Sequence, residues 1–226
     1  DQFGRDLLSR LLYGGRVSLG IALLAGTLSL LIGVAMGTTR ALGPPIVDRV
    51  LGRVEDALLA FPDLVLILLL SALFRPGLVL LIVLVGGTGW MALSRIVRGE
   101  ICSLRERYWF LAARAIGASP TRLFRHHLLP HLAGTLLTDT SLRVGAIVLL
   151  ETALSFLGFG VQPPTASWGS MIADGRVHIA SAWWLSTLPG LAIVVTVLAC
   201  FLIAESPTAR HRTTRFASRL PIESSN

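Results

Sequence analysis

The stretch WWLSTLPGLAIVVTVLACFLIA, residues 183–204, is long, apolar and free of charged side chains. A helix needs about 20 such residues to cross the roughly 30 Å hydrocarbon core of a bilayer. Because that core offers the backbone no water, its N–H and C=O groups must be satisfied within a helix or a closed barrel. Residues 183–204 therefore predict a membrane-spanning helix, with Trp183 and Trp184 as aromatic anchors at the membrane surface.

Four further apolar stretches lie upstream, at about residues 17–38, 57–74, 78–95 and 132–158. The chain is 53% hydrophobic and 15% charged, with a mean hydropathy of +0.71, which is too apolar for a soluble domain. We therefore expect an all-α, polytopic bundle of five transmembrane helices over residues 1–205, followed by a polar tail over residues 206–226. Pro62 is expected to kink or start the second span. The link 75–77 should make the second and third spans a tight antiparallel pair.

Every basic side chain except histidine is Arg, and the Arg residues are distributed unevenly between the loops. The loop 99–130 and the tail are rich in Arg, whereas the loop 159–182 carries only Arg176. Because cytoplasmic loops hold the excess of positive charge, loop 99–130 and the tail are predicted to be cytoplasmic and loop 159–182 external. The Arg residues flank apolar runs and do not interleave with exposed aromatic residues, so the pattern does not favour binding of nucleic acid.

Signals for catalysis or metal binding are sparse. The sequence contains no His-Glu-x-x-His, Gly-x-Ser-x-Gly or phosphate-loop pattern, and Cys102 and Cys200 stand alone. His126, His127 and His131 lie close together, but Pro130 is expected to interrupt the helical spacing of the last two, and we expect no metal site there. The sequence therefore does not indicate an enzyme. An intramembrane enzyme built on buried acids or on these histidines is the weaker alternative.

Three charged residues fall within the stretch 132–158, namely Asp139, Arg143 and Glu151. A charge at the centre of a bilayer costs at least about 2.5–3.5 kcal/mol, so each of them must face protein or water. Asp139 and Arg143 are one helical turn apart and are predicted to form an ion pair. Glu151 either lines a translocation path or forms a buried polar tie between helices, and the sequence leaves both readings open.

The loop between the third and fourth spans has the signals of a helix-turn-helix elbow. Residues 108–116 can form one or two helical turns, and Gly117 can end them in a left-handed conformation. Ser119 and Pro120 suit the N-cap and the first position of a second short helix. Four small side chains in the elbow would let a partner approach closely: Ala112, Ala113, Ala115 and Ala118.

The predicted external segment 162–176 is rich in Pro and Gly. Gln162 lies at its start, and Trp168 and Met171 are its apolar anchors. The segment is expected either to fold back as a gate-like hairpin or to form an ordered loop that only caps the bundle.

Several motifs stand in the order and spacing of one family of membrane proteins. They are Gly4 to Leu11, Ser103 to Arg107, Ala112-Ala113 with Gly117, Leu129 and Pro130, Leu150 to Gly158, Gln162 to Pro164, and Trp168-Gly169. Together they resemble the second, C-type permease subunit of the dipeptide, oligopeptide and nickel group of ABC importers, in which the loop called EAA carries the Ala, Gly, Leu and Pro positions. The resemblance covers about residues 3–200.

This resemblance implies a bacterial inner-membrane permease that translocates a peptide or a nickel complex by alternating access. Its partners would be a second homologous permease, two cytoplasmic ATP-binding subunits and an extracytoplasmic solute-binding protein. The partner subunits would bind ATP and Mg, with no cofactor in this chain. The elbow would be the coupling helix that contacts an ATP-binding subunit, through Glu106, Ala112, Ala113, Gly117, Ala118, Ser119, Pro120, Leu129 and Pro130. In this family a further span precedes the motif at Gly4, and we expect that it is absent from the sequence.

The chain departs from the family pattern at several positions. Leu111 replaces the Glu of the EAA motif, and His127 replaces an Ile that is common there. Phe201 and the pair Ala204-Glu205 stand where the family has Asn and Gly-Asp. These departures keep a second hypothesis open, in which the chain is a degenerate, non-transporting membrane scaffold.

Overall fold

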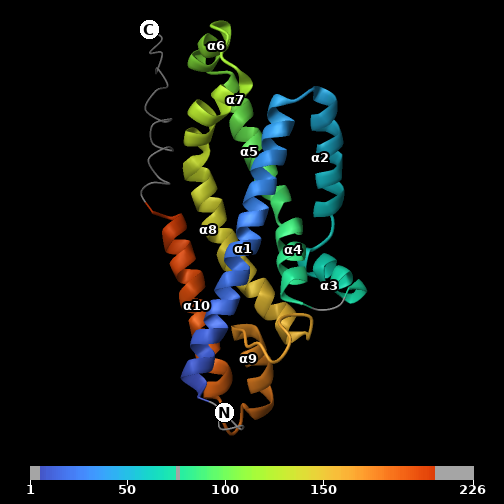
Figure 1. Cartoon of the computed structure of the whole chain (residues 1–226), viewed down its shortest axis with the longest axis vertical. Coiled ribbons are helices and arrows are strands. Elements are labelled where there is room, and N and C mark those ends of the chain that lie inside the picture. The colour runs from blue at the N-terminus through green and yellow to red at the C-terminus, as the bar shows by residue number, and fades with distance from the viewer. Residues whose placement is uncertain (1–5, 75–76, 207–226) are drawn as a thin grey trace, which may run out of the picture.

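The computed structural model describes residues 6–74 and 77–206, and within them the regular elements are all helices (Figure 1). The α-helices are α1 (Leu7–Leu42), α2 (Pro45–Leu59), α3 (Asp63–Leu73), α4 (Leu78–Thr88), α5 (Trp90–Arg105), α6 (Tyr108–Ala115), α7 (Pro120–Leu123), α8 (Leu129–Phe156), α9 (Trp168–Gly175) and α10 (Trp184–Ala204). Two short turns complete the set, the π-helix η1 (Phe124–Leu128) and the 3-10 helix η2 (Arg176–His178). The predicted all-α class is confirmed.

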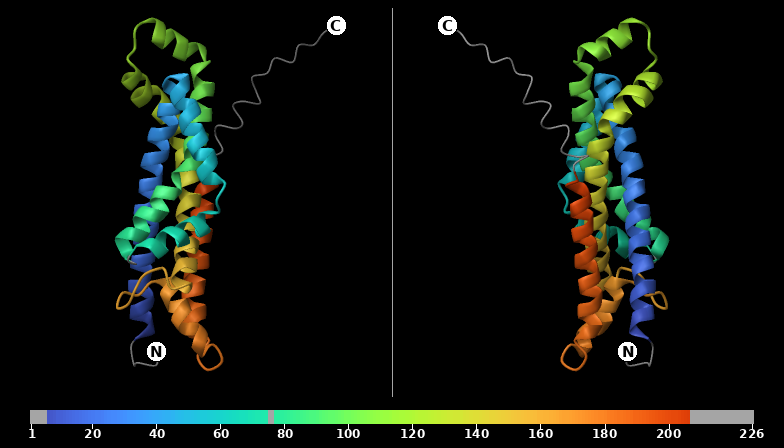
Figure 2. Two further views of the ribbon diagram at one scale, coloured as in Figure 1. Left: turned by 90° about the vertical axis from the view of Figure 1, so that its right-hand side faces the viewer. Right: turned by 90° about the vertical axis from the view of Figure 1, so that its left-hand side faces the viewer.

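The longest helices run along the long axis of the molecule, with α6 and α7 at one end and α9 at the other (Figures 1 and 2). We call these the elbow end and the α9 end. The long helices pack side by side: α1 packs against α4, α5 and α8, and α8 packs against α10. Each end has its own apolar core: one contains Leu93, Ile101 and Leu128, and the other contains Ile21 and Val148.

Small residues on α1 let its neighbours lie very close. A Cβ atom added to Gly37 would lie 2.6 Å from the carbonyl oxygen of Ser94 on α5. One turn earlier, a Cβ on Gly33 would lie 2.9 Å from Leu93. Ser29, a further turn earlier, donates a 3.0 Å hydrogen bond to the carbonyl of Gly86 on α4. Such small-residue faces are how membrane helices gain close packing without a hydrophobic driving force.

The first span begins well before residue 17, because Asp6 caps α1. The Asp6 carboxylate accepts hydrogen bonds from the backbone N–H groups of Leu8 and Ser9, at 3.2 and 3.0 Å. It also accepts one from the Ser9 hydroxyl, and these bonds hold the pKa of Asp6 below its usual range. The cap satisfies donors that would otherwise be unpaired at the helix start, so the helix extends to Leu7.

The predicted second span, 57–74, is wrong in its boundaries. The structure instead forms α2 and α3, which are bent by 86° relative to each other at residues 60–62. Pro62 is the N-cap of α3, which confirms that it starts a helix. A proline disfavours the α conformation of the residue before it, so Phe61 cannot continue α2. Helices α3 and α4 are in contact, while residues 75 and 76 of the predicted link lie outside the described residues.

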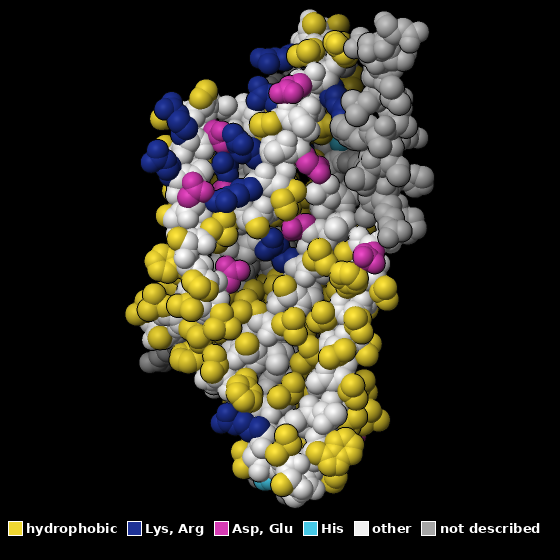
Figure 3. Space-filling view, turned by 180° about the vertical axis from the view of Figure 1, so that it is seen from behind, with side chains coloured by type: hydrophobic (Ala, Val, Ile, Leu, Met, Phe, Trp, Pro, Cys, Tyr) yellow, Lys and Arg dark blue, Asp and Glu magenta, His cyan; other side chains and the backbone are white. Residues whose placement is uncertain are grey.

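Four helical segments in the described chain are long and apolar enough to cross a membrane: Leu7–Leu42, Leu78–Arg105, Thr121–Phe156 and Trp184–Ala204. The bent pair α2 and α3 provides a fifth span if it is counted as one. The third span continues past residue 95 to Arg105, because α4 and α5 join into one helical segment. Charged side chains gather towards the elbow end, and apolar side chains cover the surface below them (Figure 3). The predicted tail, beyond Ser206, lies outside the described residues.

Candidate functional site

The elbow forms as the turn signals predict. Helix α6 ends at Ala115, and Gly117 follows with φ +83°, in the left-handed region that favours glycine. The N–H of Gly117 donates to the carbonyl of Arg114 at 3.0 Å, and the N–H of Ala118 donates to the carbonyl of Ala113 at 3.1 Å. This pair of bonds is the Schellman arrangement, which ends a helix and reverses the chain.

The second arm of the elbow leads directly into the fourth span. The Ser119 hydroxyl accepts a 3.4 Å hydrogen bond from the N–H of Arg122 at the start of α7, as expected for an N-cap. Pro130 lies in the first turn of α8, and directly before it the chain takes the wider π-helical turn of η1. A proline inside a helix removes one N–H and crowds the preceding turn, and a π turn accommodates both effects. The helical path therefore continues from Thr121 to Phe156.

The elbow has an inner and an outer face. Phe110, Leu123 and Leu128 form its inner core, and Ala113 and Ala118 pack against them. The outer face exposes 91% of Tyr108, 50% of Leu111 and 86% of Ile116. Other predicted contact residues are also exposed or half-exposed here: Glu106, Ala112, Ser119, Leu129 and Pro130. Ala113 and Ala118 are half-buried against this inner core, whereas Ala112 and Ala115 are exposed. That these four small side chains let a partner approach closely stays a prediction.

Two of the three histidines pack against an aromatic ring of the elbow. The ring of Trp109 stacks on His131 at 5.3 Å between centroids and lies 5.6 Å from the ring of His127. The Nδ1 atom of His131 lies 2.7 Å from the carbonyl oxygen of His127. The π-helical turn η1 lies directly before Pro130, and the helix continues through this proline. The expected interruption of the helix between His127 and His131 therefore does not occur. Among the described residues, no three His, Cys, Asp or Glu side chains are grouped so as to hold a metal ion.

The stem of the elbow, α5, takes part in a network of charged side chains around one buried acid. Glu55 of α2 is fully buried, forms ion pairs with Arg40 of α1 and Arg95 of α5, and accepts a 2.6 Å hydrogen bond from the Ser94 hydroxyl. Asp48 of α2 pairs with Arg40 at 3.0 Å and accepts two hydrogen bonds from the guanidinium of the next basic residue on α5, Arg98. The network joins α1, α2 and α5.

The same stem makes two further polar contacts. The Arg105 guanidinium donates to the carbonyl of Ala41 at the end of α1, and the Thr135 hydroxyl of α8 donates to the Glu100 carboxylate. Helix α5 is therefore joined by polar side chains to α1, α2 and α8, and it runs directly into the elbow.

The predicted ion pair within the fourth span is confirmed. The Arg143 Nε atom lies 3.2 Å from the Asp139 carboxylate, and both side chains are mostly buried, with 16% and 17% exposed. Each charge thus has its partner on the same helix face, one turn away.

Glu151 is fully buried and accepts hydrogen bonds from the hydroxyl groups of Ser18, Ser155 and Ser167. These serines come from α1, α8 and the N-cap of α9. The contacts match the polar tie that was one of the two readings of this residue.

The segment before and within α9 packs against the helices around it. Trp168 and Met171 are 7% and 4% exposed, and α9 contacts α8 and α10. The Gln162 amide donates to the carbonyls of Gly158 and Gly160, at 3.0 and 3.2 Å. This geometry fits the expectation of an ordered cap better than that of a hairpin free to move.

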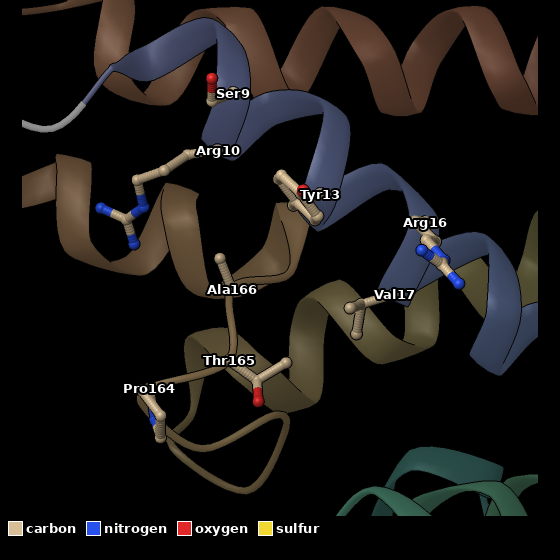
Figure 4. A pocket seen from close by; sticks show the side chains of 8 residues that line it. All are labelled: Ser9, Arg10, Tyr13, Arg16, Val17, Pro164, Thr165 and Ala166. Atoms are coloured by element: carbon tan, nitrogen blue, oxygen red, sulfur yellow. The ribbon is translucent and has the colours of Figure 1, made fainter.

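An open groove lies beside this segment, between its backbone and the first turns of α1 (Figure 4). Its volume is about 510 Å³. The residues that line it are Ser9, Arg10, Tyr13, Arg16, Val17, Pro164, Thr165 and Ala166. Arg10 points towards α9, where its guanidinium lies 3.6 Å from the Asp174 carboxylate.

The elbow, the intramembrane charges and the α9 cap all lie within residues 29–207, which match the family described as binding-protein-dependent transport system inner membrane component. The chain belongs to this family. It is a permease subunit of an ABC importer, located in the inner membrane. As a permease subunit it is not an enzyme, and ATP hydrolysis takes place in separate subunits.

Relatives of this permease support the same assignment. A putative peptide transport system permease protein of Brucella suis biovar 1 (strain 1330) is 41% identical over 205 residues, a match that covers 91% of this chain and 69% of the relative. The dipeptide transport system permease protein DppC of Bacillus subtilis (strain 168) is 37% identical over 200 residues, covering 88% and 62%. The chain thus spans about two thirds of the length of these relatives. The predicted resemblance to peptide permeases is confirmed.

Among solved structures, the permease resembles a chain of the inward-facing MetNI methionine ABC transporter. The TM-score is 0.71 at 16% identity, covering 90% of this chain and 96% of that one. At this identity the likeness shows the fold alone.

The charged network around the permease stem was not predicted from the sequence, in which the Arg residues were interpreted only as signals of topology. A pattern that could have identified it is present in α2. Its exposed apolar residues Ile46, Val50 and Val54 recur every four positions, and the acids Asp48 and Glu55 are two helical turns apart at other positions. Such a pattern in a membrane protein indicates a helix with its polar face turned towards other helices.

Proposed function

We propose that this permease works with a second, homologous permease, two cytoplasmic ATP-binding subunits and an extracytoplasmic binding protein, and that the substrate is a peptide. The family consists of membrane components of binding-protein-dependent transport systems, which supports ATPase and binding-protein partners. The relatives named above are a putative peptide permease and a dipeptide permease, which supports peptides over nickel. Substrate choice would rest largely with the binding protein, which delivers the peptide.

The elbow end would face the cytoplasm, as the Arg-rich loop 99–130 indicates. Single cysteines provide a test, after Cys102 and Cys200 have been replaced by Ser. A membrane-impermeant thiol reagent applied to intact cells should label a cysteine at Thr165, which is exposed beside the groove, and should not label one at Ser119 in the elbow. Labelling at position 119 without labelling at position 165 would invert this topology.

The observation that carries the coupling role is the exposed apolar face of the elbow. Tyr108, Leu111 and Ile116 project from a turn that is fixed by its own hydrogen bonds, at the end of the molecule that we assign to the cytoplasm. Exposed apolar patches of this kind mark sites where another protein binds. Arg114 and Arg122 are exposed on the same elbow, so the matching partner surface would be an apolar groove with acidic residues at its rim.

Movement of the elbow would reach the transmembrane helices through α5. Polar side chains join this stem to α1, α2 and α8, so that a rigid-body tilt of the elbow would carry these helices with it. The mechanism would be alternating access, driven by closure of the ATP-binding subunits.

Two substitutions test this coupling. Gly117→Val places a β-branched residue at φ +83°, which costs at least about 1–2 kcal/mol and distorts the turn. Ala112→Trp adds bulk to the outer face and leaves the inner packing intact. In the complete importer, both variants should insert in the membrane yet lose transport, with the ATP-binding subunits either dissociated or no longer stimulated by the loaded binding protein.

Gly99→Val is the matched control, because Gly99 lies in α5 with open space around it and an ordinary helical conformation. It should retain transport. If Gly117→Val and Ala112→Trp also retain normal transport and stimulation, the elbow is not the coupling element. An unmodified chain that assembles with its partners but transports nothing would instead support the scaffold hypothesis.

A further inference from the structure

Glu151 has an unusual set of partners for a fully buried acid. The partners that the structure gives to its carboxylate are three serine hydroxyl groups. Oε1 accepts from Ser155 at 2.7 Å and from Ser167 at 2.8 Å, and Oε2 accepts from Ser18 at 3.1 Å. The carboxylate is the acceptor in all three of these hydrogen bonds.

Each of these hydroxyl oxygens in turn accepts a backbone N–H from the segment around α9. Ser155 accepts from Val161 at 3.3 Å, Ser18 accepts from Trp168 at 3.1 Å, and Ser167 accepts from Ser170 at 3.1 Å. One carboxylate is therefore linked by hydrogen bonds, through three serine hydroxyl groups, to the backbone N–H groups of residues 161, 168 and 170. The charge also lies at the N-terminus of α9, where the helix dipole favours an anion.

A steric contact holds the same segment against α1. The ring of Trp168 covers Gly15 so closely that a Cβ atom there would lie 2.7 Å from the ring. Its indole Nε1 donates a 3.0 Å hydrogen bond to the carbonyl of Leu11. Residues adjacent to these contacts, Val17, Thr165 and Ala166, line the open groove (Figure 4). The Glu151 contacts therefore set the shape of one wall of the groove.

We propose that Glu151 is a positioning residue for the external surface of the permease: by fixing segment 161–170 on α1 and α8, it presets the surface with which the loaded binding protein makes contact. This inference rests on the proposed function, because it takes the α9 end to be external and the partner to be a binding protein. The segment lies at the end opposite the elbow, so a change here should affect the response to the binding protein without touching the ATPase contact (Figure 1).

The test uses the complete importer in lipid vesicles and titrates the loaded binding protein while ATP hydrolysis is measured. Glu151→Gln keeps the shape of the side chain but removes the charge and one acceptor oxygen. We expect the half-maximal concentration of binding protein to rise roughly tenfold, the change that about 1.4 kcal/mol produces. The basal rate of hydrolysis should be unchanged. Glu151→Asp, which retains the charge, should show a smaller rise, and Glu205→Gln, at an exposed position beyond α10, should show none.

A second, milder variant provides the test if Glu151→Gln does not fold. Ser18→Ala removes one hydroxyl and leaves the Trp168 N–H without its acceptor, while the carboxylate keeps two partners. It should also raise the half-maximal concentration, and a thiol-reactive spin label on a cysteine at Thr165 should become more mobile in both variants.

Three outcomes would overturn the inference. One is an unchanged half-maximal concentration in Glu151→Gln or, if that variant does not assemble, in Ser18→Ala. Another is a fall in the maximal rate of ATP hydrolysis that is fully explained by a smaller amount of assembled importer. In that case Glu151 would only stabilise the fold. The third is unaltered mobility of the label. Absence of stimulation in the unmodified importer would instead count against the proposed function itself.

Discussion

Replacing Gly37 by Ala tests how closely α1 and α5 are packed. The added Cβ would lie 2.6 Å from the Ser94 carbonyl oxygen and 2.8 Å from the Cβ of Val97. The first of these atoms belongs to the backbone, so no side-chain rotation can relieve the contact. The two helices must separate, which weakens the apolar core formed by Leu93, Val97 and Ile101 at the elbow end.

The expected size of the effect follows from these distances. Overpacking in a well-packed core typically costs about 1–3 kcal/mol. Gly20→Ala is the matched control on the same helix, because no atom lies within 4 Å of its added Cβ. At that position Ala should stabilise the helix by about 0.5–1 kcal/mol. The two variants should therefore differ by about 1.5–4 kcal/mol in free energy of unfolding.

The measurement is thermal unfolding of the purified permease in detergent, followed by helical circular dichroism. For a chain of this size about 1 kcal/mol corresponds to roughly 2–4 °C, so Gly37→Ala should melt about 3–16 °C below Gly20→Ala. Equal melting temperatures in the two variants would mean that α1 and α5 are not in the close contact described here. A higher melting temperature for Gly37→Ala would refute the reasoning outright.

Three further substitutions probe the buried charges and the helix packing. Arg143→Leu should destabilise the permease by about 3–5 kcal/mol by leaving the acid of its ion pair uncompensated, and adding Asp139→Leu should recover much of the loss; a double variant no more stable than the single one would exclude the pairing. Glu55→Ala should cost about 1–3 kcal/mol in a denaturation assay, because the buried Ser94 hydroxyl loses its acceptor and Arg40 keeps only one of its two acids; a loss below about 1 kcal/mol would show the network to be unimportant. Gly145→Cys should form a disulfide with Cys200 on mild oxidation, since the Cβ of residue 145 would lie 3.5 Å from that of Cys200. The cross-link is detected on a non-reducing gel, with a Cys200→Ser chain as the control. Its absence would argue against the packing of α8 on α10.

The features that could be predicted from the sequence depend on neighbours in the chain. The span 183–204 is apolar throughout, so its helix is required by the bilayer alone. The turn at Gly117 depends on hydrogen bonds between residues only a few positions apart. The pair Asp139 and Arg143 is set by the pitch of a single helix.

The errors in the boundaries of the second span have a cause outside the local sequence. The bend at Pro62 could be predicted, but the charged face of α2 that makes residues 45–59 a separate helix has meaning only when α1 and α5 lie against it. Similarly, the sequence places Ala112 and Ala113 side by side. Only the packing of the elbow decides that Ala113 faces its inner core and Ala112 faces outwards.

Tertiary structure alone decided the contacts between distant segments. Ser18 and Glu151 are 133 positions apart, and Arg40 and Glu55 belong to different helices. A buried charge must find a partner, and this requirement can be stated from the sequence. Which partner it finds depends on how far each helix is rotated and shifted against its neighbours. Small residues such as Gly33 and Gly37 allow a neighbouring helix to approach closely, but which helix approaches them is decided only when the helices pack together.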